Sequence, residues 1–388
     1  METQKQQSGA IAGEARGVDV ARLERELAAM WRESAAGDGE GASEPGVTRV
    51  CVANLIVYAP RREGREGIDE VLDAVTEQTP TRAVVLLADT EAAESKLDAY
   101  VSTRCQAAPR GGKQVCGEQV TIEAGGRALE HLATAAEPLL VPDIPTFLWW
   151  KDIPHYEDKL FARLVELCER VVIDSAAFNH PREDLLMVAR LISGHPRLAL
   201  TDLNWGRLTT LRNLLAGFWD VADYREHLDR LDAVEVEFAP PRAAPGQTSA
   251  QALLLAGWLA SRLGWELISA GETSAGGGCS FHLRSAGREI DLRLVVADGV
   301  EEGAGVTVRR VTLRRWDGAA EFQARMSRDW TKLETTARVG QGHEVGRVLA
   351  YEARSEGQRL SREMAVLSRD HVYEEAAICA ARLIGAVG

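Results

Sequence analysis

The run TRVCVANLIVY occupies residues 48–58 and is apolar and rich in β-branched side chains. This composition is typical of a strand buried on both faces of a sheet. An apolar stripe at helical spacing follows over residues 68–78, and AVVLL at residues 83–87 is a second buried strand. A strand, a helix and a strand in this order predict a parallel pair with a right-handed crossover.

The alternation continues after one interruption. Residues 97–107 and 113–123 are predicted strands around Gly111-Gly112, which indicates an inserted hairpin. Three further strands, separated by amphipathic helices, are TFLWW (146–150), VVID (171–174) and LALT (198–201). Strands that alternate with helices predict an α/β fold with a doubly wound, mostly parallel sheet.

The second half of the chain has a different pattern. After a helix over residues 247–263, several strands follow without helices between them, and a long helix over residues 370–386 closes the chain. This order predicts a smaller α+β domain with an antiparallel sheet. We therefore expect a disordered or helical N-terminal extension (1–46), an α/β domain (47–235) and an α+β domain (236–388).

Composition narrows the possible partners and compartments. The net charge of −13 argues against nucleic acid and anionic membrane surfaces. The longest apolar run, residues 252–260, is too short to span a membrane, and the N-terminus shows no signal peptide, so a cytoplasmic location is expected. Six scattered cysteines predict reduced thiols and no zinc site.

Polar and aromatic residues follow three predicted strands at their carboxyl ends, where open α/β sheets bind ligands. If the strands are neighbours, one edge gathers the candidate binding or interface residues, which are Trp149, Trp150, Lys151, Asp174, Ser175, Asp202, Asn204, Trp205 and Arg207. They could form a small-molecule or peptide site. Equally, the Asp, Ser and Asn residues could be helix N-caps, and at least one tryptophan could be core.

Three other features leave two interpretations each. The loop at residues 59–67 contains arginines that could meet a phosphate or simply face solvent, but it has no glycine-rich phosphate motif. Arg310, Thr312 and Arg314 share one face of a strand, as a basic strip for an acidic partner or as a solvated face. Cys105 and Cys116 could lie opposite each other on the hairpin as a redox pair or remain unlinked.

Catalytic signatures are missing from the sequence. There is no G-x-S-x-G elbow, no H-E-x-x-H and no pair of histidines at helical spacing. We therefore predict no catalytic residues, no metal site and no cofactor.

Four sequence blocks carry a family likeness. They are QVCGEQVTI (114–122), PLLVPDIPTFLWWKDIP (138–154), LCERVVIDSAAF (167–178) and LTDLNWGRLTTLRNLLAGFWD (200–220). In this order and at this spacing, the chain resembles the OpcA family of glucose-6-phosphate dehydrogenase assembly proteins. The likeness covers about residues 48–220 and extends more loosely beyond them.

The resemblance implies a non-catalytic effector that binds glucose-6-phosphate dehydrogenase, supports its oligomeric assembly and activates it. It would thereby affect the oxidative pentose phosphate pathway. Trp149, Trp150, Trp205 and Arg207 are then candidates for the interface or its support, because interfaces favour tryptophan and arginine anchors. The alternative is a sensor or enzyme that uses the strand-end residues for a sugar phosphate or nucleotide.

Overall fold

The structure is a computed structural model that describes residues 7–9, 19–36, 48–49, 51–61, 65–106, 115–273, 276–297, 299, 301–303, 305–342, 344–366 and 368–387. The chain forms two compact units. The first comprises Met1–Ile173, Arg197–Thr201 and Ser355–Ser368, and the second comprises Asp174–Pro196, Asp202–Arg354 and Arg369–Gly388. Parts of the predicted N-terminal extension (1–46) and the Gly111-Gly112 turn lie outside the described residues.

The sheet of the first unit has nine strands. They are β1 (Gln7–Gly9), β2 (Thr48–Arg49), β3 (Ala53–Pro60), β4 (Thr81–Asp89), β5 (Lys96–Gln106), β6 (Val115–Gly125), β7 (Thr146–Trp150), β8 (Arg170–Ile173) and β9 (Ala199–Asp202). Their order is β1-β5-β6-β4-β3-β7-β8-β9, with β2 beside β6. Strands β6, β4, β3, β7 and β8 run parallel, which confirms the predicted doubly wound sheet.

The opening β-α-β unit is present, with one correction. The single strand predicted over residues 48–58 is two strands, since β2 pairs with β6 whereas β3 pairs with β4 and β7. All eight residues of β3 are buried, as expected for a parallel strand covered on both faces. β1 lies within the extension that was predicted to be disordered or helical (1–46), and it pairs antiparallel with the edge of β5.

The predicted hairpin is formed by β5 and β6, which pair antiparallel over their full length. Cys105 and Cys116 are direct partners in this register, and Cys116 is disulfide-bonded. The prediction of reduced thiols is therefore wrong for Cys116, because the cross-strand register places a second cysteine opposite it.

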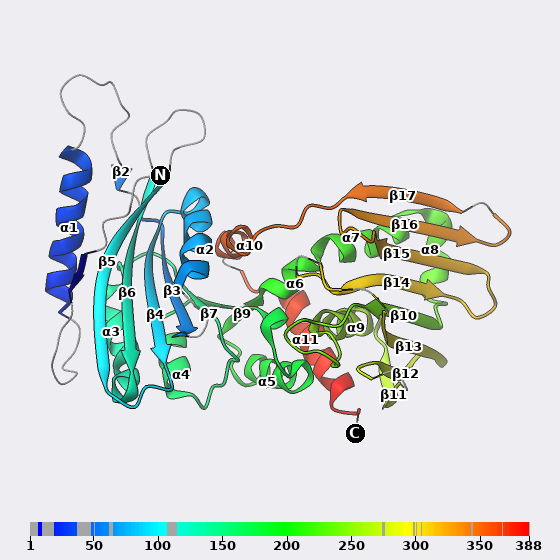
Figure 1. Cartoon of the computed structure of the whole chain (residues 1–388). Coiled ribbons are helices and arrows are strands. Elements are labelled where there is room, and N and C mark those ends of the chain that lie inside the picture. The colour runs from blue at the N-terminus through cyan, green and yellow to red at the C-terminus, as the bar shows by residue number, and fades with distance from the viewer. Residues whose placement is uncertain are drawn as a thin grey trace, which may run out of the picture. The chain divides into compact units, whose positions relative to one another are not determined.

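The helices of the first unit cover its sheet. They are α1 (Val20–Ala36), α2 (Arg65–Gln78), η2 (Gly126–His131), α3 (Leu132–Ala136), η3 (Glu137–Leu139), α4 (Lys159–Val165) and α10 (Glu356–Met364). Figure 1 shows α10 beside α2, although the two helices are far apart in sequence. A Cβ on Gly357 would lie 2.7 Å from the carbonyl oxygen of Val71, so this contact requires glycine. α4 begins at Lys159 because the Asp158 side chain caps it.

The sheet of the second unit has eight strands. They are β10 (Ala233–Phe238), β11 (Glu266–Glu272), β12 (Cys279–Ser285), β13 (Arg288–Val296), β14 (Val308–Arg314), β15 (Ala320–Met326), β16 (Lys332–Val339) and β17 (Val345–Ala350), in the order β11-β12-β13-β10-β14-β15-β16-β17. Neighbouring strands pair antiparallel except β10 and β13, which are parallel, so the sheet is mixed. The boundary predicted between residues 235 and 236 falls inside β10; the division into those two domains stays a prediction.

Helices bury one face of this second sheet. They are η4 (Ser175–Ala177), α5 (Pro181–Gly194), α6 (Leu203–Arg207), α7 (Thr209–Gly217), η5 (Phe218–Asp220), α8 (Ala222–Leu228), α9 (Ala250–Leu263) and α11 (His371–Ile384). α9 and α11 lie side by side (Figure 1). The segment of residues 203–220 forms three helical pieces, α6, α7 and η5, and the N–H of Leu208 bonds the carbonyl of Trp205 in a tighter turn between the first two.

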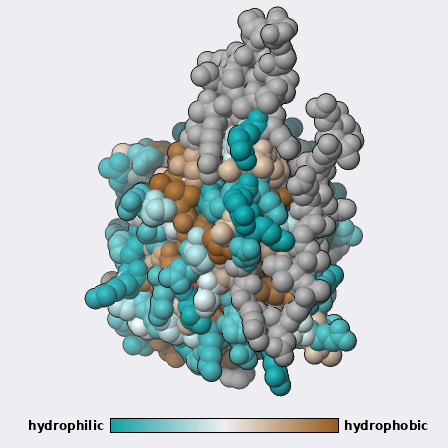
Figure 2. Space-filling model, turned by 90° about the vertical axis from the view of Figure 1, so that its left-hand side faces the viewer, coloured by the Kyte–Doolittle hydropathy of each residue, from teal (hydrophilic) through white to brown (hydrophobic). Residues whose placement is uncertain are grey.

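The surface of the first unit on its α1 side is mixed in character. Figure 2 shows hydrophilic residues there interspersed with smaller apolar areas. Leu23 and Leu27 of α1 are fully buried, as in the apolar stripe of an amphipathic helix. Across the described ranges, no helix combines the length and the hydrophobicity that crossing a membrane requires.

Candidate functional site

The strands that carry the predicted site residues, β7, β8 and β9, are neighbours in that order. The condition on which the predicted site depended is therefore met. Three of its residues, Trp149, Trp150 and Lys151, belong to the first unit. The remaining six belong to the second unit and are Asp174, Ser175, Asp202, Asn204, Trp205 and Arg207.

Trp149 and Trp150 are core residues of the first unit, with exposed fractions of 0% and 2%. Their side chains point to opposite faces of β7, as strand geometry requires. The ammonium of Lys151 lies 4.4 Å from the centroid of the Trp149 ring and 3.2 Å from the Glu356 carboxylate. Lys151 is thereby held by a cation–π contact and an ion pair.

Trp150 is fixed on the other face of the sheet. Its ring stacks on Tyr58 of β3 with centroids 3.8 Å apart and planes 11° from parallel. The edge of Phe161 from α4 packs against it at 4.9 Å. The indole N–H donates to the carbonyl of Ile153 at 3.3 Å. These contacts make Trp150 part of a rigid aromatic layer.

In the second unit, Asp174 and Arg207 form a two-pronged ion pair. Nη1 and Nη2 of Arg207 donate to Oδ1 and Oδ2 of Asp174 at 2.6 and 2.7 Å. Asp174 also accepts from the N–H of Ala176 and so caps η4. This geometry holds both side chains in one arrangement and confirms the N-cap interpretation for Asp174.

Asp202 is completely buried at the end of β9. It accepts hydrogen bonds from the backbone N–H of Ser175 (3.0 Å), the Ser175 hydroxyl (2.6 Å) and the backbone N–H of Asn204 (2.8 Å). The last of these caps α6. Burial, with a smaller effect of the Asp174 carboxylate, raises the pKa of Asp202 to about 7, although the three hydrogen-bond donors act in the opposite direction.

Asn204 extends this cluster toward α9. Its amide nitrogen donates to the Ser175 hydroxyl at 3.0 Å, and its oxygen accepts from Nε2 of Gln251 at 2.7 Å. Gln251 also donates to the carbonyl of Gly305 and accepts from the backbone N–H of Thr307. Neither Gln251 nor Thr307 is among the residues predicted from the sequence. A glutamine directly before the apolar run of a predicted helix was the available signal for the first of them.

Trp205 is equally enclosed, with 2% of its surface exposed. Its indole N–H donates to the Asp370 carboxylate at 3.0 Å. The guanidinium carbon of Arg212 lies 3.4 Å from the ring centroid. Trp205 therefore joins α6, α7 and the start of α11 inside the second unit.

We name the residues Asp174, Ser175, Asp202, Asn204, Arg207, Gln251 and Thr307 the buried polar network. A cavity of about 10 Å³ lies beside Ser175, Asn204 and Gln251, and a single water needs roughly that much. The polar groups of the network are satisfied largely by one another. This arrangement connects helices and strands through hydrogen bonds. A binding role for these residues stays a prediction.

The other predicted features have internal partners as well. Arg310 and Arg314 pair with Glu237 and Glu235 on the neighbouring strand β10, so the expected basic strip is neutralised within the sheet. Arg61, at the start of the arginine-containing loop, pairs with Asp89 at 3.1 Å. Among the residues that the structure describes, no group of three His, Cys, Asp or Glu side chains could hold a metal ion.

The fold and these clusters define a two-unit α/β protein whose strand-end polar residues bond to one another. Comparison with known proteins gives the family. Residues 72–190 match the family described as the N-terminal domain of a glucose-6-phosphate dehydrogenase subunit, and residues 198–377 match the family described as its C-terminal domain. The chain belongs to the OpcA family.

Two relatives show the extent of the likeness. A protein named as the OxPP cycle protein OpcA of Nostoc punctiforme is 34% identical over 206 residues, which cover 52% of this chain and 42% of that protein. The protein of the same name from Synechocystis sp. is 30% identical over 215 residues, covering 55% and 42%. The matches thus span about two-fifths of the length of these relatives.

Two solved structures show a distant likeness. A 3-ketoreductase from Actinomadura kijaniata is 13% identical with a TM-score of 0.48, covering 87% of this chain and 97% of that chain. An aldose–aldose oxidoreductase from Caulobacter crescentus is 11% identical with a TM-score of 0.47, covering 87% and 96%. A likeness at this level says nothing about activity.

Proposed function

We propose that this protein is a non-catalytic effector that binds glucose-6-phosphate dehydrogenase in the cytoplasm, promotes its oligomeric assembly and activates it. The single observation that carries the proposal is the match, in order, to both halves of a family described as a subunit of that dehydrogenase. Through this partner the protein would affect the oxidative pentose phosphate pathway. Neither nucleic acid nor a membrane is a proposed partner.

The chemistry of the buried polar network supports a role without catalysis. A catalytic carboxylate or hydroxyl has to reach a substrate atom, whereas Asp202 and the Ser175 hydroxyl bond to each other at 2.6 Å in the interior. The small cavity beside them also weakens the alternative of a sugar-phosphate or nucleotide site made by these strand-end residues.

The burial of Trp149, Trp150 and Trp205 assigns them a supporting part in this proposal. Side chains with at most 2% exposure offer a partner almost no contact area. They hold the strand ends and helices that present other residues to the dehydrogenase. The interface itself is then made by exposed residues.

A direct test mixes the purified protein with glucose-6-phosphate dehydrogenase from the same organism. We expect the two proteins to co-elute in size-exclusion chromatography with light scattering, and the dehydrogenase to shift to a larger oligomer. We also expect a higher maximal rate or a lower Michaelis constant.

An unrelated dehydrogenase that uses the same coenzyme serves as the control and should remain separate and unchanged. Separate elution of the cognate pair, together with unaltered kinetics over a range of salt concentrations, would overturn the proposal.

A further inference from the structure

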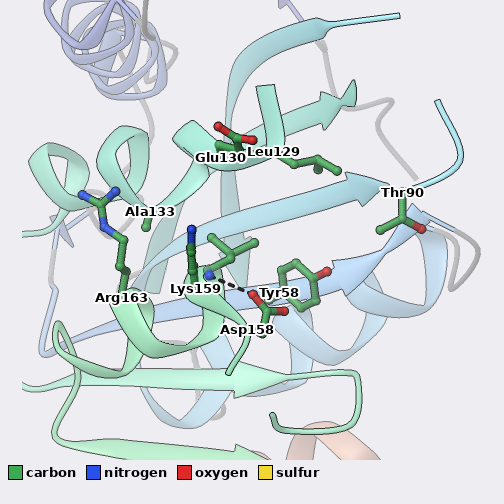
Figure 3. A pocket seen from close by; sticks show the side chains of 9 residues that line it. Tyr58, Thr90, Leu129, Glu130, Ala133, Asp158, Lys159 and Arg163 are labelled. Atoms are coloured by element: carbon green, nitrogen blue, oxygen red, sulfur yellow. Dashed lines mark hydrogen bonds between the residues drawn. The ribbon is translucent and has the colours of Figure 1, made fainter. Parts of the chain in front are cut away.

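A second polar feature belongs to the first unit alone. It is a cavity of about 440 Å³, within the range of pockets that hold small molecules. Its lining residues come from four separate segments and are Tyr58, Thr90, Leu129, Glu130, Ala133, Asp158, Lys159, Leu160 and Arg163. Figure 3 shows these side chains around the opening between α4 and the η2–α3 segment.

The cavity occupies a special position in the sheet. Tyr58 is near the carboxyl end of β3, Thr90 follows β4, and η2 and α4 follow β6 and β7. From β3 the chain continues to β4 on one side and, later, to β7 on the other. The direction of strand order therefore reverses at β3, and open α/β sheets bind ligands at the carboxyl ends of strands at such a point.

Two cations stand on one wall of the cavity. Lys159 and Arg163 are four residues apart on α4, so they share a face of the helix. Figure 3 shows both side chains extending from α4 toward the segment that carries Glu130 and Ala133. Arg163 donates one hydrogen bond to the Thr134 hydroxyl at 3.1 Å, which leaves further guanidinium donors. Within the described ranges, the Lys159 ammonium has no partner.

Hydrogen-bond acceptors and an apolar surface complete the lining. Glu130 and Asp158 contribute carboxylates, and Asp158 uses one oxygen to cap α4 at 2.8 Å from the N–H of Leu160. The Tyr58 ring is held in place by its stacking on Trp150. Leu129 and Leu160 add apolar surface beside it.

We propose that this cavity binds the phosphate monoester of a small polyhydroxylated molecule. The phosphate lies against Lys159 and Arg163, which supply charge-assisted hydrogen bonds. The hydroxyl groups donate to Glu130 and Asp158, and the carbon skeleton lies against the Tyr58 ring. A fully apolar ligand would make no use of the Lys159 ammonium, the remaining Arg163 donors or the carboxylates, and a bare anion would leave the acceptors and the apolar surface unused.

Isothermal titration calorimetry on the full chain tests this proposal with ribose 5-phosphate, glucose 6-phosphate, glucose and inorganic phosphate as probes. We expect saturable binding of at least one sugar phosphate. Glucose and inorganic phosphate should each bind at least about tenfold more weakly, since each offers only part of the complementary chemistry. The experiment uses the protein alone, so its result is independent of the proposed interaction with the dehydrogenase.

The double variant Lys159→Gln/Arg163→Gln should weaken sugar-phosphate binding by at least about tenfold. The matched control Lys332→Gln/Arg347→Gln removes the same charge from exposed positions of β16 and β17 and should bind as the parent does. Melting temperatures of all variants verify that they are folded. Three outcomes would overturn the proposal: no saturable binding of either sugar phosphate, inorganic phosphate binding as tightly as they do, or equal binding by the Lys159→Gln/Arg163→Gln variant.

Discussion

At the scale of single residues, Asp202 shows how burial competes with hydrogen bonding. Three donors from Ser175 and Asn204 surround its carboxylate and favour the charged form. Complete burial and the nearby Asp174 carboxylate favour the neutral form, and they prevail, since the pKa is raised to about 7. The raised pKa of Asp202 should therefore make the free energy of unfolding depend on pH.

The substitution Asp202→Asn removes the titrating group but keeps an amide oxygen for the N–H groups of Ser175 and Asn204. The folded carboxyl has a higher pKa than the unfolded one, whose value is near 3.8. The contribution of Asp202 to stability is therefore complete below pH 3.8 and is lost as the pH rises through about 7. From pH ~4 to ~7.5, the parent should lose up to about 4 kcal/mol of unfolding free energy relative to the variant.

Urea denaturation across this pH range measures the difference. Asp329→Asn is a suitable control, because hydrogen bonds from Ser327 and Thr331 lower the pKa of Asp329 to about 2. The stabilising contribution of Asp329 is lost only as the pH falls. The Asp329→Asn variant should therefore lose as much unfolding free energy as the parent when the pH rises. Parallel curves for the parent and Asp202→Asn would contradict a raised pKa.

At the scale of elements, the contact of α9 with α11 depends on one glycine. A Cβ on Gly257 would lie 2.2 Å from the carbonyl oxygen of Ala376 and 2.6 Å from the amide nitrogen of Ala380. Both atoms belong to the backbone of α11, so neither can move as a flexible side chain would. The two helices lie closer than any other residue at position 257 would allow.

Gly257→Ala should therefore lower the free energy of unfolding by about 1–3 kcal/mol or more, because the helices must separate. Chemical denaturation monitored by circular dichroism measures this loss. Gly217→Ala is the matched control, since nothing lies within 4 Å of the added carbon at the end of α7. It should stabilise the protein by up to about 1 kcal/mol. Equal effects of the two substitutions would show that α9 and α11 can move apart freely.

At the scale of the whole molecule, the proposed partner needs exposed anchors. Trp316 is 65% exposed and stands beside a shallow cavity of about 250 Å³ that Arg293, Arg314 and Arg315 help to line. Tryptophan and arginine around a concave surface are typical of residues that dominate binding energy. Trp316 is thus a better candidate for direct contact than the three buried tryptophans.

Trp316→Ala should change the stability of the isolated protein by no more than about 0.5 kcal/mol. It should weaken the complex with glucose-6-phosphate dehydrogenase by about tenfold or more. Surface plasmon resonance with immobilised dehydrogenase measures the affinity. Ile268→Ala, at an exposed apolar position of β11, is the comparison and should bind normally. A complex that tolerates Trp316→Ala but not Ile268→Ala would place the interface elsewhere.

Much of this protein follows from local sequence patterns. Apolar runs such as TFLWW predict buried strands, and the helical stripes between them predict a parallel sheet, because both patterns reflect the period of the element itself. The cap interpretation of Asp174 and Asp202, one of the two that the sequence left open, is also local, and both residues are caps in the structure. These features depend on residues close together in the chain.

Features that join distant residues became visible only in the folded chain. β17 was not predicted because all six of its residues are exposed and leave no alternating pattern. The partners Gln251 and Thr307 reach Asn204 only through folding, as does the pairing of α10 with α2 around Gly357. The cavity of the first unit likewise gathers side chains from four segments. The sequence by itself thus determines most of the elements and the family. Folding determines which polar groups bond to one another and which line a cavity, because such contacts join residues far apart in the chain.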